Sequence, residues 1–365
     1  MLHFRSLSES SHTIIGNALG TVLTGQTSPT ILGTISHHES SDSPNEISPE
    51  MTAKRMTGQS GKPIVSVVMP FLDKPVELFE EAVDSVLSQT YPHWELLLVD
   101  DGSATPTTNA ALKIAARDPE RIIYLEHSGH VNLGSSASRN LGIRHSRGEY
   151  LAFLDADDVW LPNKLEQQVA LIEAHASVGM LYGNTLYWHS WTGLESDARR
   201  DYFPRLGVSA NASYDPPHLL TKYLRGDAAV PCTCSILVRR GVGEKVGWFD
   251  EAFRYLYDDQ VFYARIILEA PVFVSDSSWD KYRQRAGSTS SSSVSREDKE
   301  ARLVFLMWLR GQLDARGNAD KKLERALREQ LACHGDRSFL GIPERARNLR
   351  RRARKWSRRL FGDPS

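Results

Sequence analysis

Three groups of acidic residues have the types and spacing needed for chemistry. They are Asp100-Asp101, Asp155-Ala156-Asp157-Asp158 and Asp258-Asp259. The carboxylates of residues 155–158 repel one another unless a cation or hydrogen-bond donors neutralise them. Hard oxygen ligands of this kind suit Mg²⁺ or Mn²⁺ that also bridges the phosphates of a substrate. The alternatives are a solvated acidic turn for residues 155–158, and a helix cap or turn for Asp100 and Asp101.

Small and basic residues between the acidic groups indicate an anion site. Residues 132–140 read Asn-Leu-Gly-Ser-Ser-Ala-Ser-Arg-Asn, which is typical of a helix start followed by a basic residue, Arg139. Helix N-termini favour anions, and arginine binds phosphate or a base edge. Ser135 as a simple helix cap is the alternative. The Gly-x-Gly-x-x-Gly and P-loop patterns do not occur, which argues against Rossmann dinucleotide binding and P-loop chemistry.

The elements that must position these residues alternate regularly. Hydrophobic runs predict strands at 63–70, 94–99, 121–125 and 150–154, and helical spacing predicts helices at 78–89, 107–117, 135–146 and 162–175. This alternation predicts an α/β fold with a mostly parallel central sheet and helices on both faces. The first two acidic groups directly follow strands. They should therefore lie at the carboxyl edge of the sheet, where ligands bind.

The pattern loosens after residue 180. We expect strands at 180–188, 235–238 and 272–274, and helices at 258–269, 297–314 and 319–333. Residues 189–230 suit a substrate-binding insertion. Residues 287–295 are rich in serine and predict a mobile loop.

Both ends of the chain differ from its centre. Residues 1–62 are rich in Ser and Thr, and we expect a disordered or loosely packed extension. Near the other end, apolar residues recur at spacings of 4, 3, 4, 3 and 4 from Ile342 to Leu360, flanked by nine Lys and Arg residues between 345 and 359. A basic amphipathic helix over 342–361 suits an anionic membrane surface. The alternative is a helix that packs on the catalytic domain or on a partner.

Composition narrows the classes of protein. The chain has 365 residues and a formal net charge of -1, so the 350 residues outside the basic run carry -10. An acidic body argues against nucleic-acid binding. The 3 cysteines are too few for a disulfide framework, and Cys232 with Cys234 makes no zinc motif. Without a long apolar run or a clear secretion signal, we expect a cytoplasmic protein, with peripheral attachment at the inner face of the plasma membrane through the basic helix.

Ordered motifs across residues 64–285 resemble family 2 glycosyltransferases of the GT-A fold. The matching stretches are Val65 to Pro70, Ser85 to Tyr91, Leu98 to Ser103, Ser138 to Gly142, Gly148 to Asp158, Gly247 to Asp250, and Asp258-Asp259. The resemblance implies an inverting, metal-dependent enzyme that transfers sugar from a UDP-, GDP- or dTDP-linked donor to a hydroxyl of a glycan or lipid-linked acceptor. Such enzymes serve polysaccharide and cell-envelope synthesis. The family's Gln-x-x-Arg-Trp motif of processive polymerases is absent.

The resemblance also implies roles for individual residues. Asp259 corresponds to the general base, and Asp157 to the ligand of Mn²⁺ or Mg²⁺. The implied nucleotide-sugar contacts are Pro70, Asp73, Asp100, Asp101, Ser103, Arg139, Asp155, Asp157, Arg283 and Arg285. Asp100 resembles the base-binding residue, and Asp155 the residue beside the ribose.

Some positions depart from the family pattern. Asp258-Asp259 stands where Glu-Asp is usual, Asp73 stands where Asn is common, and Arg285 stands where His is common. Two other functions stay open: a sugar nucleotidyltransferase, which should carry a Gly-rich loop after the first strand, and a non-catalytic nucleotide-sugar binding protein. We predict three regions, namely the extension 1–62, a catalytic domain 63–287, and a helical extension 288–365 that ends in the basic helix.

Overall fold

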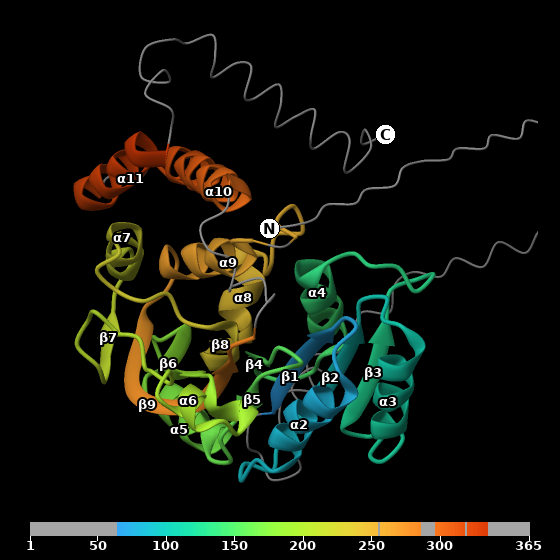
Figure 1. Cartoon of the computed structure of the whole chain (residues 1–365). Coiled ribbons are helices and arrows are strands. Elements are labelled where there is room, and N and C mark those ends of the chain that lie inside the picture. The colour runs from blue at the N-terminus through green and yellow to red at the C-terminus, as the bar shows by residue number, and fades with distance from the viewer. Residues whose placement is uncertain (1–63, 255, 286–295, 318–319, 335–365) are drawn as a thin grey trace, which may run out of the picture. The chain divides into compact units, whose positions relative to one another are not determined.

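The computed structural model describes residues 64–254, 256–285, 296–317 and 320–334 (Figure 1). All of them belong to one compact unit of the chain, Ile47–Ser365. The predicted N-terminal extension, the serine-rich segment 287–295 and the predicted basic helix at 342–361 lie outside the described residues. The division into three regions therefore stays a prediction.

The first half of the described chain alternates strands and helices as predicted. Its elements are β1 (Val65–Phe71), α2 (Val76–Leu87), β2 (Trp94–Asp100), α3 (Thr105–Ala115), β3 (Ile122–Glu126), α4 (Ser135–His145) and β4 (Tyr150–Phe153). β1 lies between β2 and β4 and pairs with both in parallel, and β2 pairs in parallel with β3. Every residue of β1 and β2 is buried, because helices cover both faces of these strands.

The second half extends the sheet and makes it mixed. It contains β5 (Val159–Trp160), α5 (Lys164–Ala174), β6 (Met180–Trp188), α6 (Glu195–Ala198), β7 (Ala212–Tyr214), α7 (His218–Arg225), β8 (Leu237–Arg239), α8 (Arg240–Val246), α9 (Asp258–Ile267) and β9 (Val272–Arg283). The strand order is β3-β2-β1-β4-β8-β6-β9-β5, with β7 on β9. β8 runs antiparallel to both β4 and β6.

β9 is far longer than the strand predicted at 272–274. It continues to Arg283 and pairs with β6 as far as Trp188. Residues 275–278 are polar, so they carry no hydrophobic signal of their own. The pairing with β6 supplies the hydrogen bonds that extend the strand. This extension carries Tyr282 and Arg283 toward the edge of the sheet where β1, β2 and β4 end.

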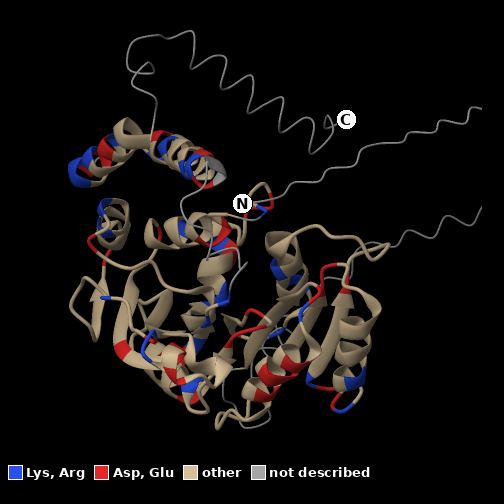
Figure 2. Cartoon of the chain, in the orientation of Figure 1, with Lys and Arg blue, Asp and Glu red and all other residues tan. Residues whose placement is uncertain are grey.

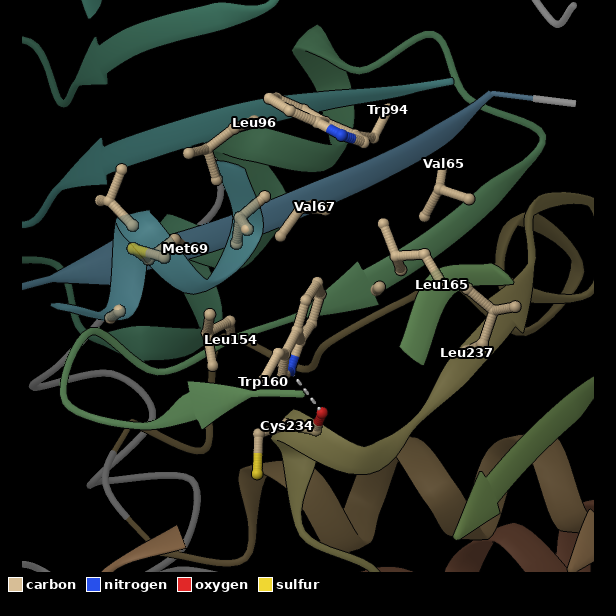
Figure 3. Close-up of a cluster of buried hydrophobic side chains, with 14 of the residues drawn as sticks. Val65, Val67, Met69, Trp94, Leu96, Leu154, Trp160, Leu165, Cys234 and Leu237 are labelled. Atoms are coloured by element: carbon tan, nitrogen blue, oxygen red, sulfur yellow. Dashed lines mark hydrogen bonds between the residues drawn. The ribbon is translucent and has the colours of Figure 1, made fainter. Parts of the chain in front are cut away.

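Two hydrophobic clusters hold the sheet and its helices together. One lies against β1 and β2 and includes Val67, Leu96 and Trp160 (Figure 3). The indole N–H of Trp160 donates to the carbonyl oxygen of Cys234 at 2.9 Å, so the polar atom of this buried ring is satisfied. The other cluster packs α9 and the helices after it against the opposite face.

Two helices follow the sheet, close to the ranges predicted for them. α10 (Arg296–Ala315) and α11 (Lys321–His334) contact α9 and α7, and bury Leu306, Leu309 and Leu323. Both helices carry basic and acidic residues together (Figure 2). Among the described residues, no helix has the length and apolar character needed to cross a membrane.

Candidate active site

The loops after β1, β2 and β4 meet the start of α9 and the end of β9 around one cavity of about 770 Å³. The predicted site residues on its wall are Pro70, Asp101, Arg139, Asp155, Asp157, Asp259, Arg283 and Arg285. These residues come from six separate segments, and the acidic groups after β2 and β4 lie at one edge of the sheet, as expected; the roles of the individual residues stay predictions. Asp73, Asp100 and Ser103 were also predicted as site residues, and they stand behind this wall rather than on it.

Asp100 shapes the loop after β2. One carboxylate oxygen accepts from the backbone N–H of Ser103 at 2.7 Å, and the other accepts from the hydroxyl of Thr108 at 2.7 Å. Asp100 is fully buried. Its side chain is thus bonded to the turn, to α3 and to the hydroxyl of Tyr124 on β3, and the contact with a nucleotide base stays a prediction.

Asp101 does face the cavity, and it joins two loops. Its carboxylate accepts from the backbone N–H groups of Leu133 and Gly134 at 2.8 and 3.0 Å. These groups belong to the segment that opens α4. Gly102, with φ +86°, allows the close approach, because a Cβ there would lie 3.0 Å from the backbone nitrogen of Asn132. The turn thereby fixes the start of α4 beside the site.

Asp73 and Ser103 tie the loop after β1 to the loop after β2. Asp73 accepts from the backbone N–H of Ala104 at 2.5 Å, and its own N–H donates to the Ser103 hydroxyl at 3.2 Å. Both residues therefore position the cavity wall from behind.

Arg139 connects two of the acidic groups. Its guanidinium donates to Asp155 and to Asp258, each at 2.8 Å, and lies 5.2 Å from the ring centroid of Phe249. Burial opposes the charge of Arg139, but the two carboxylates outweigh burial and raise its pKa. This pairing neutralises charge that Asp155 and Asp258 would otherwise leave uncompensated.

Asp157 lies between two cations. Lys74 Nζ approaches its Oδ2 at 2.9 Å, and Arg285 donates to the same oxygen. Burial raises the pKa of Asp157, and the two cations more than offset that effect, so the net shift is downward. Asp157 is therefore anionic. Sequence reasoning missed Lys74, although its place just after β1 at the ligand edge was a usable signal.

Arg283 is largely occupied inside the protein. Its Nε donates to the carbonyl oxygen of Asp157 at 2.7 Å and its Nη2 pairs with Glu81 at 2.5 Å. The guanidinium carbon lies 4.5 and 5.1 Å from the rings of Trp188 and Trp191. The backbone N–H of Arg283 also donates to Asp158, whose pKa is raised well above its ordinary value by burial and then by Asp157. Arg283 thus holds the loop that carries Asp157, which favours a positioning role over direct contact with a ligand.

Asp258 and Asp259 open α9. The N-cap position belongs to Tyr257, so neither Asp258 nor Asp259 is the cap of this helix. Negative charge in a first helical turn is favoured by the helix dipole. Asp258 also accepts from the hydroxyl of Ser135 at 2.8 Å, so its carboxylate is bonded to both Ser135 and Arg139, and it lines the cavity together with Asp259.

The pKa of Asp259 differs from that of an ordinary aspartate. Burial, and then the charge of Asp258, raise its pKa to about 7. At neutral pH a carboxylate with this pKa is deprotonated in about half of the molecules, and it is more basic than an ordinary aspartate, which suits it to accept a proton from a hydroxyl.

The carboxylates at the cavity suit a metal ion that takes only one or two of its ligands from the protein. Among the residues in the described ranges, no three His, Cys, Asp or Glu side chains gather into a metal-binding group. Asp157 is anionic and faces the cavity, with Asp155 beside it on the same loop. One or two carboxylates, with substrate phosphates completing the shell, is the usual arrangement for Mg²⁺ in nucleotide sites. The residues present therefore fit a divalent cation that binds together with a diphosphate.

Solved structures of other proteins share the fold of this chain. S. aureus TarS 1-349, solved in complex with UDP-GlcNAc, superposes with a TM-score of 0.56 at 20% identity over 74% of this chain and 72% of TarS. The mannosyltransferase PcManGT from Pyrobaculum calidifontis, solved with GDP-Man and Mn²⁺, gives a TM-score of 0.51 at 18% identity, covering 82% and 76% of the two chains. The chain therefore has the GT-A fold.

Sequence comparison adds the family. The Escherichia coli protein WfgD, a UDP-Glc:alpha-D-GlcNAc-diphosphoundecaprenol beta-1,3-glucosyltransferase, is 34% identical over 121 residues, which are 33% of this chain and 45% of WfgD. The chain spans about half the length of the curated relatives it matches. Residues 66–247 match the sequence model described as Glycosyl transferase family 2. With the strand-end motifs and the GT-A fold around them, this match establishes that the chain belongs to glycosyltransferase family 2.

Proposed function

We propose that the protein transfers a sugar from a nucleotide-diphosphate donor to an acceptor hydroxyl, with inversion at the anomeric carbon. The observation that carries the proposal is that Asp259, a carboxylate with a pKa near 7, shares one cavity with the anionic Asp157. Asp259 suits the removal of a proton, and Asp157 suits a divalent cation that would bind the diphosphate end of a donor. Family membership supports the same reaction, because the name of WfgD includes UDP-Glc, and TarS and PcManGT were solved in complex with UDP-GlcNAc and GDP-Man.

Asp259 would act on the acceptor. Its carboxylate takes the proton from the acceptor hydroxyl while the hydroxyl oxygen attacks the anomeric carbon of the donor. The bond from that carbon to the diphosphate oxygen breaks on the opposite face, so a single displacement inverts the configuration. Arg139 holds Asp258, the neighbour of Asp259, and so orients the start of α9 for this step.

Asp157, Lys74 and Arg285 would act on the leaving group. Asp157, with Asp155 beside it, would hold a Mn²⁺ or Mg²⁺ ion, which supplies positive charge to the departing diphosphate when bound. Lys74 and Arg285 bring two further cations to the same place. They bind and orient the phosphates, and they neutralise the negative charge that gathers as the bond breaks.

Pro70, Asp101 and Arg139 would border the nucleoside. All three line the cavity next to the loops after β1 and β2. Asp73, Asp100 and Ser103 support this part of the wall through the loop contacts described above. Their contribution to donor binding is therefore one of positioning.

We propose the donor, the acceptor and the location of the enzyme as the sequence predicts them. The donor is a UDP-, GDP- or dTDP-sugar, and the acceptor is a glycan or a lipid-linked saccharide. Attachment to an anionic membrane surface through residues 342–361, at the inner face of the plasma membrane, belongs to the same proposal.

A nucleotide-sugar screen tests the proposed function. Thermal unfolding of the full chain is measured with each donor, with and without Mn²⁺, because a ligand that binds the native state raises its apparent stability. The donor that binds is then incubated with acceptor candidates, and the products are identified. A transferase releases a nucleoside diphosphate, whereas a nucleotidyltransferase forms or consumes pyrophosphate. Binding with no release of either product would identify a non-catalytic binding protein and overturn the proposal.

A further inference from the structure

The start of α9, which carries Asp258 and Asp259, depends on one backbone residue with an unfavourable conformation. Tyr257, directly before the helix, has φ +64° although it is not a glycine. Its carbonyl oxygen accepts from the backbone N–H of Val261 at 2.9 Å, so the first helical hydrogen bond of α9 ends on this residue. A residue with a side chain adopts the left-handed region at a cost and stays there where its surroundings hold it. The position of Asp259 therefore depends on the contacts that fix Tyr257.

The ring of Tyr257 is held by α10. Phe305 stacks on this ring, with centroids 5.6 Å apart and planes at 16° to each other. The guanidinium carbon of Arg302, three residues earlier in α10, lies 5.6 Å from the centroid of the same ring. Phe305 is itself buried. Aromatic stacking and a cation–π contact each add to the stabilisation from burial alone, so α10 fixes the ring more firmly than apolar contact would.

Arg302 also contacts the chain on the other side of Asp259. Its Nη1 donates to Oε1 of Gln260 at 3.2 Å. Gln260 directly follows Asp259, and Tyr257 lies two residues before it. One guanidinium thus contacts the residues that flank Asp258 and Asp259. The start of α9 could shift only if these contacts with α10 were broken.

α10 lies beside α9 and reaches the cavity that contains Asp259 (Figure 1). Its first turn contributes Asp298 to the wall of that cavity. Beyond its other end, Arg316 donates to the carbonyl oxygen of Leu268, the residue after α9, at 3.2 Å. Contacts from this helix and its end therefore reach both ends of α9. The match to the family sequence model ends at residue 247, so that match assigns no role to α10.

We propose that α10 positions the general base, because Arg302 and Phe305 hold the start of α9 so that the carboxylate of Asp259 faces the acceptor hydroxyl. The inference rests on the proposed function and adds two positioning residues to it. Tyr257 and Gln260 are among the described residues that line the cavity, and Arg302 and Phe305 stand behind them. The two α10 side chains therefore act on the reaction through the residues next to Asp259.

Hydrogen exchange tests the positioning without any substrate. Exchange of the backbone amides of the full chain is followed by mass spectrometry of peptides from the start and from the end of α9. Arg302→Met and Phe305→Leu should speed exchange at the start, including the amide of Val261, by about tenfold, because the first turn loses its support. Leucine keeps an apolar side chain at position 305, so the core stays filled while the stack is lost.

Arg316→Met is the matched control for hydrogen exchange. It makes the same substitution as Arg302→Met, but it removes a guanidinium from the end of α9 instead of the start. We expect faster exchange only in the peptide that contains Leu268. Unchanged exchange at the start of α9 in Arg302→Met and Phe305→Leu, or the same increase along the whole helix in all three variants, would overturn the inference.

Steady-state kinetics test the consequence for sugar transfer. A displaced base slows the chemical step and leaves donor binding intact. Arg302→Met and Phe305→Leu should therefore lower kcat by about tenfold and change the KM of the donor by less than about twofold. Leu313→Ala truncates another buried side chain of α10 and should keep both constants within about twofold of the wild type. All variants are assayed at a temperature at which each is folded.

Three kinetic results would contradict the positioning role. An unchanged kcat in Arg302→Met and Phe305→Leu would show that the start of α9 needs no support from α10. A higher donor KM with an unchanged kcat would place the effect at the donor instead of the base. An equal fall of kcat in Leu313→Ala would show that α10 contributes packing alone.

A double variant tests the route through Gln260. The kcat of Arg302→Met with Gln260→Ala should fall by less than the product of the two single losses, because the side chains contact each other. The full product would exclude this route. Release of nucleoside diphosphate by the wild-type chain is measured separately. Its absence would count against the proposed function, whereas hydrogen exchange at the start of α9 decides the role of α10 without turnover.

Discussion

The guanidinium of Arg139 donates a 2.8 Å hydrogen bond to the carboxylate of Asp258, a residue 119 positions further along the chain. The same guanidinium pairs with Asp155 on the loop after β4. It therefore joins the part of the site proposed to hold the donor to the helix that carries Asp259. A nearly buried ion pair of this kind matters mostly for geometry, because desolvation offsets much of its attraction.

Removing Arg139 should destabilise the protein. Arg139→Ala leaves two carboxylates without their partner, and we expect the free energy of unfolding to fall by about 3–5 kcal/mol. The measurement is denaturant unfolding of this variant, of Asp258→Ala and of the double variant. The double variant should lose less stability than the sum of the single losses, since the two residues contact each other. Strict additivity would contradict an energetic link between them.

Replacing Asp259 should remove turnover and spare donor binding. In Asp259→Asn the side chain cannot accept a proton, so we expect the transfer rate to fall by on the order of 10²–10⁴. The wild-type rate should rise with pH and level off above about pH 7, because the deprotonated carboxylate is the active form and its pKa is about 7. Steady-state rates from pH 5 to 9 check this, and a flat profile would exclude Asp259 as the base.

The charged carboxylate of Asp259 should lower the stability of the protein at neutral pH. Because the pKa of Asp259 is raised in the folded state, the folded protein holds a proton that the unfolded chain releases. Stability therefore falls as the pH rises from about 4 to about 7. Asp259→Asn removes this penalty, so its melting temperature should exceed that of the wild type at pH 8 and match it at pH 4. A lower melting temperature at pH 8 would show that the charged form is well compensated.

Gly142 should be intolerant of a side chain. It lies on α4 against the sheet, and a Cβ there would approach a methyl group of Val68 to 2.6 Å. We expect Gly142→Ala to lose about 1–3 kcal/mol of stability through overpacking. Activity should fall as well, because a displaced α4 moves Arg139. Gly241→Ala is the matched control in α8, where a Cβ meets nothing within 4 Å, and it should be neutral or slightly stabilising.

Metal removal should weaken donor binding through Asp157. Chelation with EDTA should abolish the part of the thermal shift by a nucleotide sugar that depends on Mn²⁺, and added Mn²⁺ should restore it. In Asp157→Asn the shift should no longer respond to Mn²⁺, because a neutral amide is a poorer ligand for a hard cation. An unchanged response in this variant would place the metal on other residues.

Much of the first half of the fold could be predicted from local pattern. β1, β2 and β4 are mostly apolar runs, and each stays within two residues of its predicted range. The acidic groups that follow β2 and β4 meet at one edge because parallel strands end on the same side of a sheet. Residue type alone could not distinguish Asp100 from Asp101. In the structure Asp100 accepts from Ser103 and Thr108, whereas Asp101 accepts from Leu133 and Gly134 and lines the cavity.

The sequence by itself determined the family, the order of the elements and the edge of the sheet at which the acidic residues gather, because hydrophobic period and turn residues are local properties. Only the tertiary structure decided which partners those residues have. Lys74 and Arg285 meet at Asp157, Arg283 lies between Trp188 and Trp191, and Tyr202 stacks on Tyr187. Nearly all of these contacts join segments that are far apart in the chain. Packing of the whole domain brings them together, and no local periodicity encodes such a meeting.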